Sequence, residues 1–268
     1  MTKITFIRHD CFAAETPQAV FIFDYWVDTD GRPKEFPSFL DDIPDDRPLY
    51  VLVSHGHKDH YNPSVFAWAS RFANIRYVVS NDVWRRIRHI VSPTAVYSGP
   101  KVDAGLVTVL RPGERFSDID VEIIAFPSTD TGNSYMAVSG GVRIFHAGDL
   151  NAWQKSEAPT EEETRASRRE YMEIVDEIAG IYPNIDLAMF PVDSRLGTEY
   201  YEGARIFVRK FDVGIFVPMH FELVVDDEDK MKRNMDAGRF ELYSNPTRGE
   251  YIHLASSRSK LRKNFEKP

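Results

Sequence analysis

The segment that decides the fold runs from Leu49 to His60 and reads LYVLVSHGHKDH. Its first half, Leu49–Ser54, is a continuous apolar run of the kind found in strands that are buried on both faces. Its second half places three histidines and one aspartate within six positions, although the whole chain of 268 residues contains only eight histidines. This clustering predicts a metal site at the end of a buried strand.

The chemistry of the motif supports this prediction, because imidazole and carboxylate groups are the ligands that zinc, iron and manganese accept. His55 and His57 point to the same side of an extended segment, and Gly56 between them allows the backbone to bend. Asp59 and His60 follow one turn later, where they could face a second ion. The alternative, a solvated loop with chance histidines, is disfavoured by the rarity of histidine elsewhere.

The order of the elements indicates the fold class. Strands come first in each half of the chain and then alternate with helices, which predicts two packed sheets flanked by helices, an α/β four-layer αββα sandwich. At 268 residues, a single domain over residues 1–268 is the expected organisation. The predicted strands span residues 4–8, 11–15, 19–24, 49–54, 75–80, 106–110, 121–126, 134–139, 142–146, 185–191, 213–218 and 250–255, and the predicted helices span 63–72, 81–90, 160–179, 200–211 and 226–236.

Composition limits the partners. The net charge of −8 disfavours a nucleic-acid partner, and the short basic run from Arg258 to Lys263 is interpreted as a solvated end segment. The chain lacks a run of roughly 18 apolar residues, so membrane insertion is not expected. Cys11 is the single cysteine, which excludes an intrachain disulfide and fits a cytoplasmic location. We therefore expect a small-molecule substrate, and the oligomeric state stays open.

Beyond these residues, the sequence resembles the metallo-β-lactamase-fold hydrolases over nearly the whole chain. Within this family, the chain most resembles the subgroup that is similar to L-ascorbate-6-phosphate lactonase. The shared feature is a short opening strand pair, here around Arg8–Phe12. The matching features are Phe23-Asp24 on an early strand, the H-x-H-x-D-H motif at His55–His60, the aspartate in His146-Ala147-Gly148-Asp149 and the late histidine in Pro218-Met219-His220-Phe221.

The resemblance implies two neighbouring metal positions that share one bridging carboxylate, Asp149. The other implied ligands are His55 and His57 for site one, and Asp59, His60 and His220 for site two. One or two divalent ions per chain are expected, with zinc first and manganese or iron as alternatives.

Site one departs from the family pattern. The family usually supplies a third histidine between the motif and the bridging aspartate, but the stretch Pro127–Ser134 reads PSTDTGNS and contains none. Asp130 is the best substitute, since a carboxylate oxygen can bind the same ions at a similar distance. Such a ligand would favour manganese or iron over zinc. The alternative is that Asp130 is only a turn residue and that site one is weak or empty.

Other residues are candidates for supporting roles. Asp24 could orient a ligand histidine by accepting a hydrogen bond, or could only cap a turn. Arg195 follows the strand over residues 185–191 and could bind a substrate carboxylate or phosphate, or form a surface ion pair. His9 could belong to the site, and His146 could reach it or be a hydrogen-bonded core residue. The aromatic residues of the neighbouring loops, Tyr25, Trp26 and Trp153, could line a pocket or pack in the core.

Together these features predict a metal-dependent hydrolase that uses a metal-bound hydroxide to attack a small anionic ester or lactone. Asp59 is the candidate catalytic residue, holding or relaying the proton of the nucleophile. One alternative is a phosphodiesterase or nuclease of the same fold, which the acidic net charge disfavours. The other is a non-catalytic metal-binding protein with a degenerate site, which the missing third histidine would explain.

Overall fold

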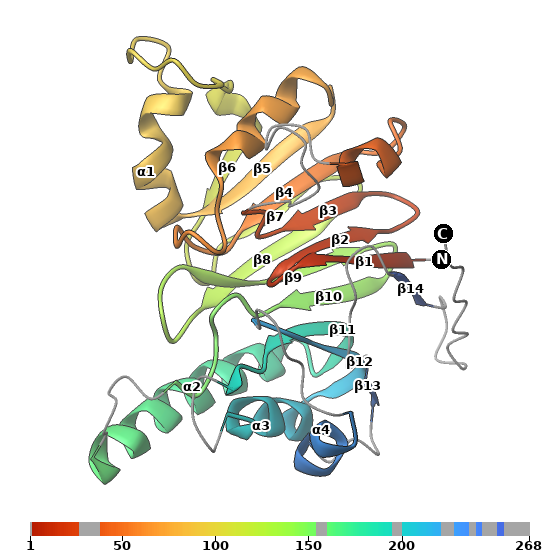
Figure 1. The fold of residues 1–268 in the computed structure, drawn as a ribbon, viewed down its shortest axis with the longest axis vertical. Coiled ribbons are helices and arrows are strands. Elements are labelled where there is room, and N and C mark those ends of the chain that lie inside the picture. Colours follow the sequence, from red (N-terminus) through yellow and green to blue (C-terminus); the bar gives the residue numbers. More distant parts are fainter. Residues whose placement is uncertain are drawn as a thin grey trace.

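The computed structural model describes residues 2–26, 38–153, 160–194, 200–220, 228–235, 240–242 and 251–254. Within these residues the strands form two seven-stranded sheets that pack face to face, with helices on their outer sides (Figure 1). The predicted αββα sandwich is therefore confirmed. Arg195 and the basic run Arg258–Lys263 lie outside the described residues.

The first sheet has the order β14-β1-β2-β3-β4-β5-β6. Its interior strand β4 shows why the apolar run of the sequence is continuous. Leu52 packs into the core between the two sheets, whereas Val51 and Val53 pack beneath the outer helices, so both faces are buried. The strands are β1 (Thr2–Arg8), β2 (Cys11–Glu15), β3 (Val20–Phe23), β4 (Leu49–Val53), β5 (Ile75–Ser80), β6 (Val107–Leu110) and β14 (Tyr251–Leu254).

The second sheet has the order β13-β12-β11-β10-β9-β8-β7 and contributes most of the core between the sheets. Its half from β10 to β13 is parallel, and its half from β7 to β10 is antiparallel. The strands are β7 (Arg115–Ser117), β8 (Glu122–Pro127), β9 (Asn133–Ser139), β10 (Val142–His146), β11 (Asn184–Pro191), β12 (Asp212–Met219) and β13 (Glu241–Leu242). Strands β7 and β13 are short and were not predicted.

Helices α2, α3 and α4 lie against the second sheet, and α1 lies against the first (Figure 1). The α-helices are α1 (Asn81–Val91), α2 (Glu161–Ile181), α3 (Glu202–Lys210) and α4 (Glu228–Met235), and the 3₁₀ helices are η1 (Ser38–Asp42), η2 (Pro63–Ser70) and η3 (Ala104–Leu106).

Two helix starts show how local chemistry sets these boundaries. Asn62 caps η2 by accepting a hydrogen bond from the Ser64 backbone, as its place before Pro63 predicts, although the segment is 3₁₀ rather than α. Helix α1 begins at Asn81, as predicted, and its N-cap residue is Ser80. No helix among the described residues is both long and apolar enough to cross a membrane.

Candidate metal centre

The predicted site residues come together at one edge of the sandwich, where parallel strands of both sheets end. In the first sheet, Asp24 follows β3 and His55 follows β4. In the second sheet, Asp149 follows β10 and His220 follows β12, and β11 lies between these two strands. Because the carboxyl ends of parallel strands meet at the same edge, residues far apart in sequence become neighbours here.

Site one gathers His55, His57, Asp130 and Asp149, whose potential ligand atoms lie within 4.8 Å of one another. His55 Nε2 lies 3.0 Å from His57 Nδ1 and 3.3 Å from Asp149 Oδ2. Asp130 Oδ2 lies 3.5 Å from His57 Nδ1. Asp130 thus joins His55, His57 and Asp149 in one group of potential ligands.

The hairpin that carries Asp130 is fastened to the metal motif. The backbone amide of Asn133 donates to the carbonyl of Ser54 over 2.9 Å. Gly132, with a φ of 71°, lies so close that a Cβ at this position would be 2.1 Å from the same Ser54 carbonyl oxygen. Only glycine fits this contact, so the β8–β9 turn is held in register with His55.

Site two is formed around His60 and His220. His60 Nε2 lies 3.1 Å from Asp149 Oδ1, and His220 Nε2 lies 3.3 Å from the same oxygen. Asp149 therefore directs Oδ2 toward site one and Oδ1 toward site two, which is the arrangement of a bridging ligand. The fourth residue of this group is Asp10, whose Oδ2 lies 3.3 Å from His60 Nε2.

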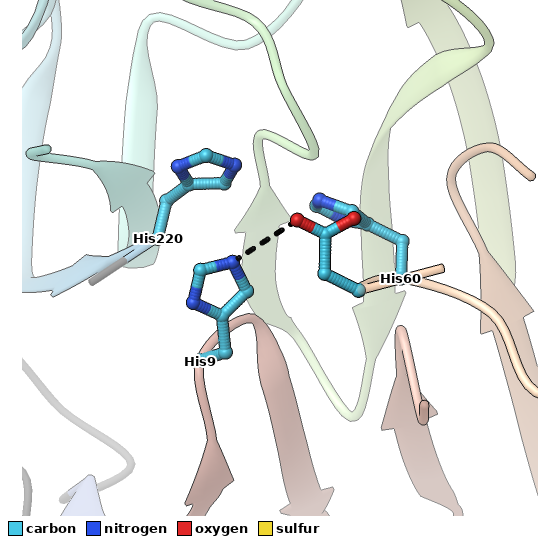
Figure 2. A group of neighbouring side chains, drawn as sticks. His9, His60 and His220 are labelled. Carbon is cyan, nitrogen blue, oxygen red and sulfur yellow. Dashed lines mark ion pairs between the residues drawn. The ribbon is translucent and has the colours of Figure 1, made fainter. Parts of the chain in front are cut away.

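Asp59 lies at the open side of site two. Its carboxylate is 3.6 Å from His9 Nε2, the ion pair drawn as a dashed line in Figure 2, and its side chain is 43% exposed. The labelled rings of His9, His60 and His220 surround one small space in that view, and His9 lies 4.7 Å from His220 between ring centroids. His9, Asp59, His60 and His220 form a third group of potential ligands.

Each histidine of site two is oriented by a buried carboxylate. Asp24 Oδ2 accepts a hydrogen bond from His60 Nδ1 over 2.8 Å, as the sequence suggested, and the same carboxylate also accepts from the Ser54 amide and hydroxyl. Asp193 Oδ2 accepts from His220 Nδ1 over 2.9 Å. With Nδ1 engaged in this way, each Nε2 is left to face the site.

Charges are strongly coupled in this cluster. Burial alone would lower the pKa of His60, but Asp10, Asp149 and Asp24 raise it well above its ordinary value. Burial likewise opposes ionisation of His220, yet Asp10, the hydrogen bond to Asp193 and Asp149 raise its pKa to about 9. In the metal-free protein these two histidines therefore hold protons where cations would bind.

The pKa values of two carboxylates in this cluster are lowered. Burial would raise the pKa of Asp149, but its contacts with His55, His60 and His220 hold that pKa well below the ordinary value. The pKa of Asp59 is also lowered, chiefly by His9. Both carboxylates are therefore ionised at neutral pH and available as metal ligands.

Backbone strain is concentrated at the same place. Among the described residues, the non-glycine residues with positive φ are His9 at 54°, Asp24 at 44° and His220 at 64°. All three contribute side chains to site two or to its support. Such conformations cost about 1–3 kcal/mol each and persist where the surrounding structure enforces them, most often at functional sites.

The geometry fits bound cations. Ligand atoms placed about 2.0–2.2 Å from a tetrahedral ion are about 3.4 Å apart, and the distances of 3.1–3.3 Å around Asp149 are close to this edge length. His60 Nε2 and Asp149 Oδ1 are also fully buried without a hydrogen bond from the described residues. Buried polar atoms in this state are costly unless an ion or proton completes them.

The remaining candidates divide between the site and the core. His146 is a core residue, donating through Nε2 to the Asp10 carbonyl and stacking on Phe23. Tyr25 is fully buried and packs on Trp68, so it does not line the site. Trp153 lies beside the site, 5.5 Å from His220 between ring centroids, and its indole donates to the Asp149 carbonyl.

Asp10 was not singled out from the sequence. The available signal was a His-Asp pair in the connection between two short opening strands, a position that fixes neither side chain to the site. Its proximity to His60 depends on the order of strands in the first sheet, which places the β1–β2 turn near the segment that follows β4.

Comparison with known proteins places this architecture in a family. Residues 3–164 match the beta-lactamase superfamily domain, and this stretch holds all of the site described above except Asp193 and His220. The chain belongs to the beta-lactamase superfamily.

Individual relatives and solved structures are also similar to this superfamily member. A UPF0173 metal-dependent hydrolase of Carboxydothermus hydrogenoformans is 31% identical over 151 residues, covering 55% of this chain and 62% of the relative. Among solved structures, the metallo hydrolase Igni18 of Ignicoccus hospitalis has a TM-score of 0.63 at 15% identity, covering 94% of this chain and 97% of its own. CmlA, a diiron beta-hydroxylase of Streptomyces venezuelae, has a TM-score of 0.59 at 15% identity, covering 94% of this chain and 54% of its own.

Proposed function

We propose that this superfamily member is a hydrolase that depends on two divalent metal ions. The observation that carries the proposal is the placement of Asp149, which directs one oxygen to His55 and the other to His60 and His220. Two groups of ligands that share a bridging carboxylate are suited to a pair of ions acting on one substrate. The relative named as a metal-dependent hydrolase supports the same activity.

The ligands divide as the resemblance implies. Site one takes His55, His57 and Asp130, and site two takes Asp59, His60 and His220, with Asp149 between them. When bound, divalent ions supply a Lewis acid that polarises a substrate oxygen and lowers the pKa of water from 15.7 to about 7.

The residues of the chain then orient the reaction. Asp59 is ionised and 43% exposed, so it can accept a hydrogen bond from an attacking water at the open side of site two. Asp24 and Asp193 fix the rings of His60 and His220 and thereby the direction of their Nε2 atoms. Orientation by such partners is worth 10–100-fold in metal affinity or activity in known metal sites.

The substrate that we propose is a small anionic ester or lactone, which enters beside the half-exposed His57 and Asp130. The acidic net charge of −8 argues against a nucleic acid, and the resemblance to the L-ascorbate-6-phosphate lactonase subgroup argues for a small metabolite. Binding of the substrate anion by Arg195 remains part of this proposal.

Zinc is the first candidate metal. Manganese or iron are alternatives because Asp130 replaces a nitrogen ligand, and CmlA shows that this fold can hold a diiron centre.

The decisive experiment combines metal analysis with a substrate panel. Elemental analysis of the purified protein should find up to two divalent ions per chain, and EDTA should abolish hydrolysis. Lactones and small esters should be hydrolysed in preference to bis-p-nitrophenyl phosphate. The reverse preference would indicate a phosphodiesterase, and a metal-free protein inert toward the whole panel would indicate a degenerate site.

A pair of histidine variants provides the matched control. His57→Ala should lower kcat/KM by at least about 10³-fold, because it removes a ligand of site one. His89→Ala should leave kcat/KM unchanged, because His89 is an exposed residue of α1 that contacts Tyr97. Full activity in His57→Ala would exclude the metal mechanism.

A further inference from the structure

Asp10 is the least explained charged group of the molecule. It lies in the connection between β1 and β2, and its side chain is 0% exposed. Neither of its carboxylate oxygens receives a hydrogen bond from the described residues. A buried carboxylate without hydrogen bonds is costly, and the nearest groups that can balance its charge are the imidazoles of His9 and His60, which lie where a bound cation would serve the same purpose.

The surroundings of Asp10 are those of a metal ligand. Its Oδ2 lies 3.3 Å from His60 Nε2, the ring atom that Asp24 leaves available for the site. Asp10, His60, Asp149 and His220 are all buried, and their potential ligand atoms lie within 4.8 Å of one another. His9 Nε2, 3.1 Å from Asp10 Oδ2, lies on the other side of the carboxylate.

The position of Asp10 is fixed through its backbone. His146 Nε2 donates to the Asp10 carbonyl over 2.8 Å, while His146 Nδ1 accepts from the Gly148 amide over 3.2 Å. The ring is stacked on Phe23 with centroids 5.0 Å apart. One core imidazole thus joins the turn that carries Asp10 to the segment that carries Asp149, so the two carboxylates keep a fixed separation.

Asp59, the aspartate that the motif assigns to site two, is placed differently. Its side chain is 43% exposed and lies toward His9, whereas the carboxylate buried among the site-two residues is that of Asp10. We propose that Asp10 donates a carboxylate oxygen to the ion at site two, with Asp59 on the solvent side of that ion. This proposal rests on the metal binding proposed above.

The consequence is a carboxylate-rich centre. Site one would have two histidines and Asp130, site two would have two histidines with Asp10 and Asp59, and Asp149 would be shared. Oxygen ligands shift preference toward manganese and iron. We therefore expect Asp10→Asn to weaken the binding of Mn²⁺ at site two by a larger factor than the binding of Zn²⁺.

The test is a titration of the metal-free full chain with Mn²⁺ alone. Binding is measured by calorimetry and by the electron paramagnetic resonance signal of free Mn²⁺. Asp10→Asn should weaken binding of one ion at least about 10-fold and leave the other unchanged. Glu15→Gln is the matched control, because Glu15 lies at the opposite end of β2, away from the metal centre, and pairs with Lys3 and Arg47. The control should bind both ions as the wild type does.

Thermal unfolding separates a ligand from a structural residue. If Asp10 is a ligand, Asp10→Asn should show a much smaller rise in Tm with Mn²⁺ than the wild type does. The reason is that an ion raises Tm only by binding to the folded protein, and the variant binds it more weakly. A purely structural role would lower Tm equally with and without Mn²⁺ and leave both affinities unchanged, which would overturn the proposal.

A structure of the zinc-loaded wild type keeps the proposal testable even where the variant fails to fold. An Asp10 oxygen is expected about 2.0–2.2 Å from the ion at site two. A separation beyond about 3 Å would overturn the role of Asp10 while leaving the two-metal hydrolase intact. Failure of the wild type to bind any ion would instead overturn the proposed function.

Discussion

The two metal positions share Asp149 but differ in their exposure to solvent. At site one, the side chains of His57 and Asp130 are 50% and 44% exposed. At site two, the side chains of His60 and His220 are 0% and 9% exposed. Site one therefore has two half-exposed ligands beside the buried His55, whereas at site two Asp59 is the one assigned ligand that is comparably exposed, at 43%, so site one is the more open position.

The hydrogen bonds that orient the ligands also differ between the two metal positions. His60 and His220 each donate Nδ1 to a buried carboxylate, Asp24 and Asp193 respectively. At site one, His55 Nδ1 contacts the Ser54 hydroxyl, and Asp130 is the exposed residue of the β8–β9 turn. Oriented and buried ligands bind ions more tightly, so we expect site two to hold its ion longer and site one to be the exchangeable position that substrate reaches.

The largest effect should come from the residue that the two positions share. Asp149→Asn removes the negative charge that faces both groups, so both ions should be lost and kcat/KM should fall by about 10⁴-fold or more. Elemental analysis after dialysis measures the loss. Retention of one ion at wild-type affinity would show that the two positions are independent.

The next largest effect should be confined to site two. Asp24→Asn replaces an acceptor of three hydrogen bonds, so it should weaken one ion 10–100-fold and destabilise the metal-free protein by about 2–4 kcal/mol. Metal titration and urea unfolding measure the two effects. Asp186→Asn, which removes a part-exposed partner of Arg143 near the start of β11, is the control and should leave both affinities unchanged.

Site one should respond separately to its own carboxylate. Asp130→Ala should weaken the more exchangeable ion about 10-fold and leave the tighter ion in place, while Asp130→His should restore binding with a larger preference for Zn²⁺ over Mn²⁺ than the wild type has. Competition titrations with the two metals distinguish these outcomes. Equal occupancy in Asp130→Ala and wild type would identify Asp130 as a turn residue only.

The smallest effect is a difference in pH dependence. Because the pKa of His220 is raised to about 9, its proton must leave when an ion binds, so affinity at site two should rise with pH up to about 9. The raised pKa has the opposite effect on the metal-free protein. The stability it contributes is complete below the unfolded pKa of about 6.5 and is lost as pH rises through about 9. Melting curves with and without Mn²⁺ between pH 6.5 and 9 should therefore diverge, and parallel curves would contradict this account.

Strand β4 and the metal motif could both be predicted from local sequence. The alternation of Val51, Leu52 and Val53 between two cores follows from the period of a strand, and it allowed β4 to be predicted. The H-x-H-x-D-H motif followed from ligand chemistry and from the rarity of histidine in the chain. The short edge strands β7 and β13, with three and two residues, carry too little periodicity to be predicted in this way.

What only the tertiary structure decided is which carboxylates meet the histidines. Asp10 and His60 are separated by three strands of chain, and Asp193 and His220 by the whole of α3 and β12. The contact of Asp10 with the site depends on a β1–β2 turn held by His146 from the opposite sheet. The sequence by itself determined the metal motif because its ligands are local, whereas the contacts of the carboxylates depend on the order of strands within each sheet, which brings together residues that share no sequence pattern.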